Sequence, residues 1–345
     1  YNDTIVGNSL ANKFTLTNGG NDTVNGGQGY DIAYLTNVKY SNVNYAINQS
    51  TGVRTITNKI TNDTIKLVNI EKIVFSDKTL LTFSNIIETG IMNITHKPKI
   101  ITLKRTFNKP ILICGDPSFN EKQHCVVKVL KITKKSFTVK LQESFKDDNK
   151  HKIESVSWIV GEKGTWTISN SNKQIIFGNF NTKLTTKKGF KKIRFSKSFS
   201  TNPVVLTQIA TNKGKELTVT RTKNVKKNSF KCSMQESDGL NNKHTNENIH
   251  WCAITPGIFN INDLKVQCGS IINVTHKPKK RNYRNNYFTN QPILLTKCSS
   301  YKAKDLVNTR IQPSRLKFIV RLQEDKTKDK ETKHGKENVD YIAIG

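Results

Sequence analysis

The stretch GGNDTVNGGQGYDIAY, residues 19 to 34, concentrates glycine and aspartate in a chain that is otherwise rich in lysine and asparagine. From Gly26 it reads as a glycine-rich turn, one carboxylate at Asp31 and then a short apolar strand. Nine residues upstream, TNGGNDTVN repeats the pattern with Asp22 in the place of Asp31. A nine-residue period of this kind predicts a parallel β-roll, in which each turn is a glycine-rich loop followed by a short strand.

The same loops predict a cation site. Glycine permits positive φ, which lets loop carbonyls turn inward, and each aspartate adds a carboxylate, so stacked loops form the all-oxygen cage that Ca²⁺ prefers. We predict calcium as the cofactor, with these ligands: Asn18, Gly20, Asp22, Gly26, Gly27, Gly29 and Asp31. The alternative interpretation is an ordinary cluster of Gly and Asn turns in a β protein.

This pattern resembles the RTX (hemolysin-type) calcium-binding repeat of secreted bacterial proteins, with one complete and one degenerate copy. Residues 40–80 continue the resemblance, because they are similar to the β segment that closes many RTX rolls. The matching positions are Asp63, Asn69, Ile70, Glu71, Phe75, Asp77 and Thr79. The resemblance implies a calcium-binding roll and cap over residues 1–85. Because residue 1 falls inside a repeat, it also implies a chain that starts partway along a longer precursor.

Residues 86–345 repeat themselves three times. The anchors are Pro110, Pro203 and Pro292, then Phe137, Phe230 and Phe318, then Trp158, Trp251 and Tyr341. Their intervals are 93 and 89, 93 and 88, and 93 and 90 residues. Three independent anchors with one spacing predict three tandem modules, at residues 86–170, 174–257 and 263–345.

The pattern inside each module favours a β-sandwich. Alternating β-branched and aromatic residues between turns rich in Asn, Gly and Lys predict about six short strands, which is typical of a small antiparallel sandwich. The modules are similar to the H-type lectins, the six-stranded sandwiches of snail agglutinins and slime-mould discoidins. This similarity rests on the F-x-x-P-[IV]-[LV]-L, [KS]-F-x-[VC]-x-[LM]-Q-E and closing W/Y-x-A-I-G-like strands. The predicted fold class is all-β: a short parallel β-roll with a capping β segment, then three tandem six-stranded antiparallel β-sandwiches.

The sugar site of H-type lectins is not visible in the sequence. Those lectins bind N-acetylgalactosamine-type sugars with an arginine on the strand before the [KS]-F strand and a histidine just after that strand. The arginine's places hold His124, Leu217 and Asp305, and the histidine's places hold Phe145, Asp238 and Lys326, with Glu216, Glu236 and Glu324 nearby. The resemblance therefore implies a lectin fold without the lectin's specificity.

Charge separates the modules from the N-terminal region. Of 56 Lys and Arg and 26 Asp and Glu, residues 1–85 hold 7 and 6, which leaves 49 and 20 for residues 86–345. The formal charge of +30 is thus about +1 and +29. So basic a surface favours acidic or sulfated glycans or other surface polyanions as partners.

Two lysine-rich runs, THKPKIITLKR (95–105) and THKPKKRNYRNNY (275–287), occupy equivalent positions and carry the densest charge. The predicted ligand-binding residues are His96, Lys97, Lys99, His276, Lys277, Lys279, Lys280 and Arg281. Alternatively, these lysines protect an exposed sheet edge from further strand pairing, which lysine does well.

Catalysis is poorly supported. The seven histidines show neither H-E-x-x-H nor a metal spacing with the cysteines, and no G-x-S-x-G, P-loop or dinucleotide fingerprint occurs. The sequence has no apolar run of about 18 residues that would predict a membrane span. It also lacks an RNP, helix-turn-helix or zinc-finger pattern. We predict a non-enzymatic protein with no membrane span, for which nucleic acid is a weakly supported partner.

Each module owns two of the six cysteines: Cys114 and Cys125, Cys232 and Cys252, and Cys268 and Cys298. In a chain with RTX features they indicate an oxidising exterior, where disulfides persist, and a secreted or cell-surface location. Equal allotment predicts pairing inside modules, with Cys232 and Cys252 on neighbouring strands, although fifteen connectivities are possible in principle. Free structural thiols are the alternative.

Two functions remain open. The first is a secreted, calcium-binding, glycan- or polyanion-binding adhesion protein. The second is a structural subunit of an extracellular filament or surface layer, in which lectin-like modules pack against copies of the chain and bind no sugar. The linked modules are expected to form either a compact pseudo-threefold cluster or an extended rod, and mutual repulsion among their positive charges opposes the compact form.

Overall fold

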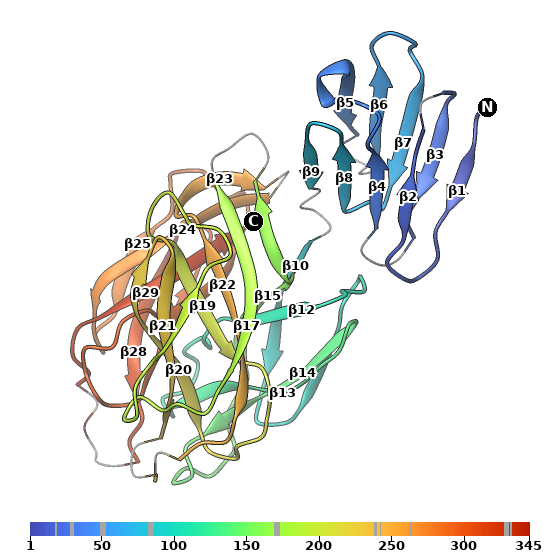
Figure 1. Cartoon of the computed structure of the whole chain (residues 1–345). Coiled ribbons are helices and arrows are strands. Elements are labelled where there is room, and N and C mark those ends of the chain that lie inside the picture. Colours follow the sequence, from blue (N-terminus) through green and yellow to red (C-terminus); the bar gives the residue numbers. More distant parts are fainter. Residues whose placement is uncertain are drawn as a thin grey trace.

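The computed structural model describes residues 1–17, 19–27, 31–48, 53–81, 86–168, 173–237, 240–241, 243–261, 264–327, 331 and 333–345. Nearly all regular structure in these ranges is β-strand, and the one helical element is the short 3₁₀ turn η1 (Tyr40–Asn42). The all-β class is therefore confirmed. Figure 1 shows a smaller unit at the N-terminal end and a larger group of sheets formed by the rest of the chain. Within the described residues, no helix has the length and hydropathy needed to cross a bilayer.

Two sheets enclose one hydrophobic core in the N-terminal unit. Their orders are β1-β3-β7-β6-β5 and β2-β4-β8-β9. The strands are β1 (Thr4–Val6), β2 (Lys13–Thr15), β3 (Asp22–Asn25), β4 (Ile32–Leu35), β5 (Val43–Ile47), β6 (Arg54–Asn58), β7 (Thr64–Val68), β8 (Lys72–Phe75) and β9 (Thr79–Leu81). Val24 and Leu67 of the first sheet and Ala33 and Ile73 of the second are fully buried in this core.

The first four strands of this unit alternate between its two sheets. β1, β3 and β7 pair in parallel, and so do β2, β4 and β8. Thr4 lies opposite Thr23 and Lys13 opposite Ile32, so the chain returns to the same sheet after 19 residues, or two nine-residue units plus one. The antiparallel strands β5, β6 and β9 then end the parallel run.

The remaining strands form three groups, here called modules 1, 2 and 3. Module 1 contains β10 (Ile87–Ile94), β11 (Lys99–Thr102), β12 (Pro110–Cys114), β13 (Cys125–Ile132), β14 (Ser136–Glu143) and β15 (Glu154–Glu162). Module 2 contains β16 (Gly164–Thr167), β17 (Gln174–Thr182), β18 (Lys191–Arg194), β19 (Val204–Ile209), β20 (Thr218–Lys226), β21 (Ser229–Glu236) and β22 (Glu247–Ile254). Module 3 contains β23 (Gly257–Ile261), β24 (Leu264–Val274), β25 (Lys279–Asn282), β26 (Ile293–Cys298), β27 (Val307–Pro313), β28 (Lys317–Glu324) and β29 (Glu337–Ile344).

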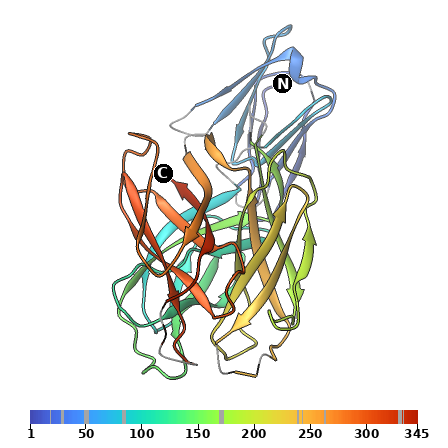
Figure 2. The same ribbon diagram turned by 90° about the vertical axis from the view of Figure 1, so that its left-hand side faces the viewer.

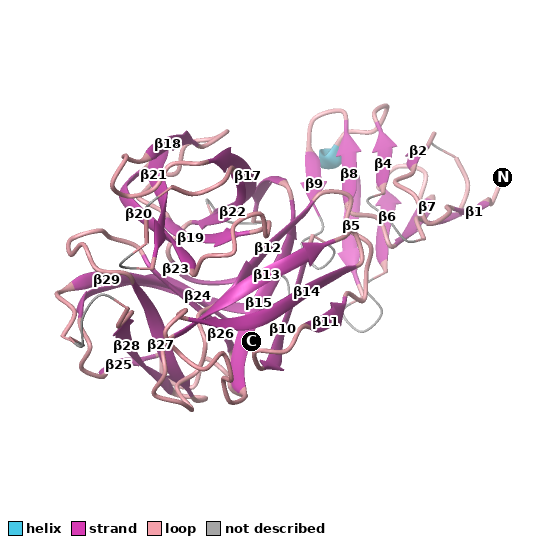
Figure 3. Ribbon diagram, turned by 90° about the horizontal axis from the view of Figure 1, so that it is seen from below, coloured by secondary structure: helices cyan, strands magenta, loops and turns pink. Residues whose placement is uncertain are grey.

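Each module has an inner and an outer antiparallel sheet. The inner sheets are β10-β15-β12, β16-β17-β22-β19 and β23-β24-β29-β26, and the outer sheets are β11-β14-β13, β18-β21-β20 and β25-β28-β27. Figure 3, a view from below, shows the three modules arranged around a common centre, and Figure 2 shows them side by side under the N-terminal unit. Of the two arrangements expected for the linked modules, the chain adopts the compact one.

The inner sheets of all three modules share one hydrophobic core. β12 contacts β22, β19 contacts β29, and β26 contacts β15, so the contacts close a cycle from module 1 to 2, 2 to 3 and 3 to 1. Ile113, Leu206 and Leu295, from the equivalent strands β12, β19 and β26, are fully buried in this shared core. Burial of this apolar surface favours the compact form and offsets the mutual repulsion of the basic modules.

Three unlike side chains perform the same task in this cycle. The residue before each Trp or Tyr anchor accepts a hydrogen bond from a backbone N–H of the neighbouring module. The bonds run from Leu112 N to His250 Nδ1 (3.0 Å), from Val205 N to Asp340 Oδ2 (2.8 Å) and from Leu294 N to Ser157 Oγ (3.1 Å). Each bond satisfies a buried donor that would otherwise be costly to leave unpaired.

A glycine faces each large aromatic anchor across the inner sheet. Gly90 lies opposite Trp158, and Gly178 lies opposite Trp251. A Cβ atom would lie 2.6 Å from the Trp158 ring at the first position and 2.2 Å from the Trp251 ring at the second, so no larger residue fits. At the third position, Gly269 faces the smaller Tyr341, and a Cβ would have 3.5 Å of clearance.

The structure does not form the predicted disulfides within modules. All six cysteines are buried free thiols. Alternation along β22 explains one pair: Trp251 and Ala253 point into the core of module 2, where Cys232 lies, so Cys252 between them points the opposite way, into the shared core. The third pair fails for the same reason, since Cys268 lies in the shared core and Cys298 in the core of module 3. The alternative of free structural thiols matches the structure.

Candidate functional site

The glycine-rich loops of the N-terminal unit are stacked through hydrogen bonds from backbone N–H groups to carboxylate side chains. Asn12 N donates to Asp31 Oδ1 (2.7 Å), and Asp31 N donates to Glu71 Oε2 (2.6 Å). In the other row of loops, Asp3 N donates to Asp22 Oδ1 (2.9 Å). The aspartates that were predicted as calcium ligands thus each receive a backbone N–H from the loop one turn earlier.

Asp31 is the least solvated of these carboxylates. It is 0% exposed, its Oδ2 has no hydrogen-bond partner, and burial raises its pKa to about 6 despite the Asn12 N–H and the nearby Arg105. A Cβ at Gly26 would lie 2.5 Å from this Oδ2, so the close approach of the loop requires glycine. Gly20 and Gly27 have φ of 86° and 85°, in the left-handed region that glycine favours. The predicted ligands Asn18 and Gly29 lie outside the described residues.

One basic residue at each module interface reaches into the next module. Arg310 Nη2 lies 2.5 Å from Glu154 Oε1, and Arg221 Nη2 lies 2.6 Å from Glu337 Oε1, with all four side chains fully buried. At the equivalent place in module 1, Lys128 Nζ donates to Gly214 O (2.9 Å). These contacts follow the same cycle as the inner sheets.

The acidic partner at each interface also holds a loop of its own module. Glu154 accepts from Asn120 N (3.0 Å) and Glu121 N (3.1 Å). Glu247 accepts from Lys213 N and Gly214 N (2.7 Å each), and Glu337 from Lys302 N (2.9 Å) and Ala303 N (3.1 Å). A carboxylate that accepts several N–H groups is a rigid support for its loop.

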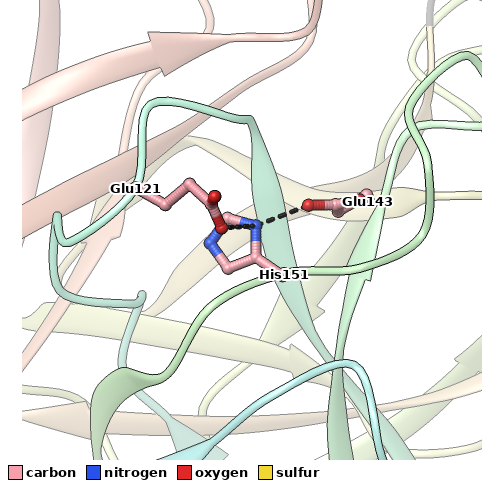
Figure 4. Close-up of side chains that lie close together, drawn as sticks. All are labelled: Glu121, Glu143 and His151. Atoms are coloured by element: carbon pink, nitrogen blue, oxygen red, sulfur yellow. Dashed lines mark hydrogen bonds and ion pairs between the residues drawn. The ribbon is translucent and has the colours of Figure 1, made fainter.

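Each module places a buried histidine beside this carboxylate. His151 Nε2 lies 3.3 Å from Glu154, and its Nδ1 lies 2.6 Å from Glu143 and 3.5 Å from Glu121. Figure 4 shows Glu121 and Glu143 approaching the imidazole from different sides. The pattern recurs around His244 with Glu236, Glu216 and Glu247, and around His334 with Glu324 and Glu337.

In modules 1 and 3 the electrostatics favour charge on the histidine and on the carboxylate three residues after it, because the pKa values of His151 and His334 are raised and those of Glu154 and Glu337 are lowered. Burial alone would lower the pKa of His151, but hydrogen bonds to Cys125 and Glu154 raise it to about 10. The pKa of His334 is raised in the same way, against burial, by Glu324 and Glu337. Although burial opposes it, hydrogen bonds from His334 and the charge of Arg221 hold the pKa of Glu337 down at about 2.

A basic groove of about 280 Å³ lies between modules 1 and 2. Its lining residues are Pro98, Lys128, Leu130, Lys140, Gln142, Asn212 and Lys215. Burial, and then repulsion by Lys140, lowers the pKa of Lys128, so positive charge is crowded there. Gln142 Nε2 donates to Lys215 O (2.8 Å) and ties the two walls of the groove together.

One residue of the groove wall, Asn212, differs in size from its equivalents. At the other two interfaces the residue equivalent to Asn212 is aromatic: the Arg310 guanidinium lies 5.2 Å from the Phe119 ring centre, and the Arg221 guanidinium 5.1 Å from that of Tyr301. A cleft of about 460 Å³ between modules 2 and 3 is larger but less basic, because its lining includes Asp340.

The two lysine-rich runs lie at the edges of equivalent outer sheets. Lys99 Nζ donates to Asn93 O (3.0 Å) and Lys279 Nζ to Ile272 O (2.7 Å). His96 and His276 are half-buried, whereas Lys97, Lys277, Lys280 and Arg281 are exposed. Pro98, inside the first run, borders the basic groove.

The positions that correspond to the arginine and histidine of the lectin sugar site differ in their exposure to solvent. His124 and Leu217 are buried, and Phe145 is 56% exposed. Asp238 lies outside the described residues. The neighbouring Glu216, Glu236 and Glu324 instead join the histidine clusters. Sequence reasoning missed these clusters, although each module carries a Q-E pair followed by H-x-x-E, with histidines at intervals of 93 and 90 residues.

Halomucin of Haloquadratum walsbyi is 26% identical to this chain over 265 residues. The aligned region covers 71% of this chain but 3% of halomucin, so the chain spans only a small part of this curated relative. No family model matches the chain, and no solved structure gives a significant match.

Proposed function

We propose that the chain is a surface or adhesion-type protein that binds acidic or sulfated glycans in the basic groove between modules 1 and 2. The groove supports this proposal most directly: Lys128, Lys140 and Lys215 converge on a space large enough for sugar units. Sulfate and carboxylate groups accept charge-assisted hydrogen bonds from lysine. The match to halomucin is compatible with a surface protein, and an extracellular location belongs to the same proposal.

Binding of dextran sulfate, with neutral dextran as the comparison, tests this function. We expect Lys140→Ala combined with Lys215→Ala to weaken binding at physiological salt by roughly tenfold or more, because two charge-assisted contacts are lost. Asn212→Tyr should have a similar effect without changing the charge, since it places in the groove the side chain that Tyr301 has at the next interface.

The matched control removes the same charge elsewhere. Lys192 and Lys231 lie opposite each other on the outer sheet of module 2, and Lys192→Ala combined with Lys231→Ala should leave binding close to that of the wild type. If the two double variants lost the same amount of dextran sulfate binding, the interaction would depend on overall surface charge, and a specific binding groove would be contradicted. Neutral dextran bound as well as dextran sulfate would contradict the ligand class.

We also propose that the stacked loops of the N-terminal unit form an RTX-type roll that binds calcium. The described residues fit a hard cation, because Asp31 Oδ2 is a buried carboxylate oxygen without a partner beside the glycine-lined loop. Asp31 with loop carbonyls of Gly26 and Gly27 would hold an ion in one row of loops, and Asp22 with the carbonyl of Gly20 would hold one in the other row. Bound calcium would supply the positive charge that a buried carboxylate needs. A roll of this kind would act as a folding clamp beside the modules.

Calcium should raise the melting temperature of the full chain, because a ligand that binds only the folded state stabilises it. Asp31→Asn keeps the acceptor for Asn12 N–H and removes the charge, and should reduce the calcium response more than Asp22→Asn does. Asp63→Asn, a charge change outside the glycine-rich loops, serves as the control. Differential scanning calorimetry with and without Ca²⁺ measures the effect, and a wild-type melting curve indifferent to Ca²⁺ would rule out the site.

A structural subunit is the second candidate function. One observation favours it: β11 and β23 end their sheets, and Ile100 and Ile258 on these strands are 67% and 41% exposed. Unpaired strand edges with exposed apolar residues are templates for association with another chain. Multi-angle light scattering over a range of concentrations separates the candidates, since a subunit of a filament forms larger species as concentration rises.

A further inference from the structure

We propose that the histidine clusters of modules 1 and 2 are sites for a divalent transition metal of the Zn²⁺ type. In each cluster one imidazole nitrogen and two carboxylate oxygens lie within 4.8 Å of one another: Glu121, Glu143 and His151 in module 1, and Glu216, Glu236 and His244 in module 2. These sites are separate from the glycine-rich loops, and the module 2 cluster adjoins the basic groove, because Lys128 lines one pocket with Glu216 and His244.

The two ring nitrogens of each histidine have different surroundings, as a metal ligand requires. Nδ1 of His244 faces Glu236 (3.1 Å) and Glu216 (3.6 Å), while Nε2 faces Glu247 (3.7 Å). A histidine that binds a metal through one nitrogen commonly donates its other N–H to a carboxylate, which fixes the tautomer and the ring orientation. Glu154 occupies that supporting position in module 1, at 3.3 Å from His151 Nε2, and in module 2 Glu247 is the carboxylate that faces Nε2.

Each cluster contains a buried polar atom that has no hydrogen-bond partner. The His244 side chain is 2% exposed, and its Nδ1 has no hydrogen-bond partner although two carboxylates face it. In module 1, Glu143 is 3% exposed and its Oε2 also has no hydrogen-bond partner. Buried polar atoms are normally satisfied, so these atoms indicate a missing ligand.

The donor set selects the metal class. One imidazole and two carboxylates leave a fourth tetrahedral position open, and imidazole ligation suits zinc and its neighbours rather than calcium. With a neutral imidazole, two carboxylates carry two negative charges, which one divalent cation balances.

Module 3 provides a control built into the chain. His334 faces Glu324 at 3.0 Å and Glu337 at 3.6 Å, but the described residues assemble no third ligand around its Nδ1. By strand register, Asn308 pairs with Gln323 as Val219 pairs with Gln235, so Asp305 stands where module 2 has Glu216 and is one methylene shorter. We therefore expect two metal sites in the chain and not three.

Equilibrium dialysis of the full chain against Zn²⁺ in excess Ca²⁺, with metal counted by mass spectrometry, tests the proposal. The wild type should retain two equivalents. Glu216→Gln changes a carboxylate that is 39% exposed, so the fold should persist, and it should weaken one site by at least roughly tenfold. Glu121→Gln should do the same for the other site, and the double variant should retain neither equivalent.

His334→Asn is the matched control, because it removes the equivalent buried imidazole from module 3 and should leave both equivalents in place. Co²⁺ gives a second readout, since visible absorption bands typical of tetrahedral nitrogen and oxygen ligation should appear in the wild type and vanish in the double variant. No retained zinc in the wild type, or two equivalents retained by the double variant, would overturn the proposal. Neither result depends on whether dextran sulfate binds.

Discussion

Replacing Arg310 with alanine is expected to lower the free energy of unfolding by about 3–5 kcal/mol, the usual cost of breaking a buried ion pair from one side. The Arg310 side chain is fully buried and lies 2.5 Å from Glu154. Its Nε also donates to Ser118 O (2.6 Å) and its Nη1 to Gln123 O (3.0 Å). The alanine variant leaves Glu154 charged and buried and opens the contact between modules 3 and 1. Urea unfolding measures the change, read from the midpoint at constant slope.

Two substitutions bracket this result. Arg310→Lys imitates Lys128, the natural residue at the first interface, and should cost less than the alanine variant because the charge is kept while the planar fork is lost. Arg315→Ala removes an exposed arginine a few residues further along the chain and should change stability by no more than about 0.5 kcal/mol. Similar values for Arg310→Ala and Arg315→Ala would show that the interface does not depend on the ion pair.

Acid should weaken the contact between modules 1 and 2 through His250. Burial, and then the charge of Lys163, lowers the pKa of His250 from 6.5 to about 4, and its Nδ1 must stay unprotonated to accept from Leu112 N. Between these values the unfolded chain binds more protons than the folded chain. The stabilisation is therefore complete above pH 6.5 and is lost as the pH falls towards 4. A single group of this kind costs about 2 kcal/mol between pH 7 and pH 5.

His250→Ser isolates this contribution, because Ser157 already performs the same task at another interface. The variant should lose less stability than the wild type when urea unfolding is compared at pH 7 and pH 5. His151 and His334 do not mask the effect. Their pKa values are raised, so the stability that they contribute is complete below 6.5 and is lost only at higher pH. Equal losses in variant and wild type would contradict the role of His250.

The sequence could predict features that depend on short-range pattern. The Gly and Asp spacing indicated short strands about nine residues apart, and strands begin at Thr4, Lys13, Asp22 and Ile32. Repeated anchors indicated modules with one strand order, because each anchor is a core position. The partner of each strand was a different matter: Thr4 pairs with Thr23 and not with Lys13, since successive strands enter different sheets.

The module interfaces could not be predicted, because they join positions that the sequence places far apart. In the sequence, Arg221 and Arg310 could be recognised only as contributions to the net positive charge of the modules. Arginines are rarely buried unless a partner neutralises them, and the sequence does not show such a partner. Each finds its carboxylate in the next module, 116 residues further along for Arg221 and 156 residues back for Arg310. The predicted disulfides were wrong because the presence of two cysteines in each module does not show into which hydrophobic core each thiol points.

The three unlike acceptors His250, Asp340 and Ser157 have a consequence for how this chain can vary. In a trimer of identical subunits, the same side chain would be the acceptor at all three interfaces. Any substitution of it would therefore change all three interfaces at once. In the fused chain a substitution at one of these positions changes only one interface, so each interface can vary independently of the other two. The order of modules around the ring is likewise fixed by the order of the chain. If one module were excised and assembled with its own copies, the hydrogen-bond acceptor or the basic residue that it presents to each neighbour would not be the one found at that interface in the full chain.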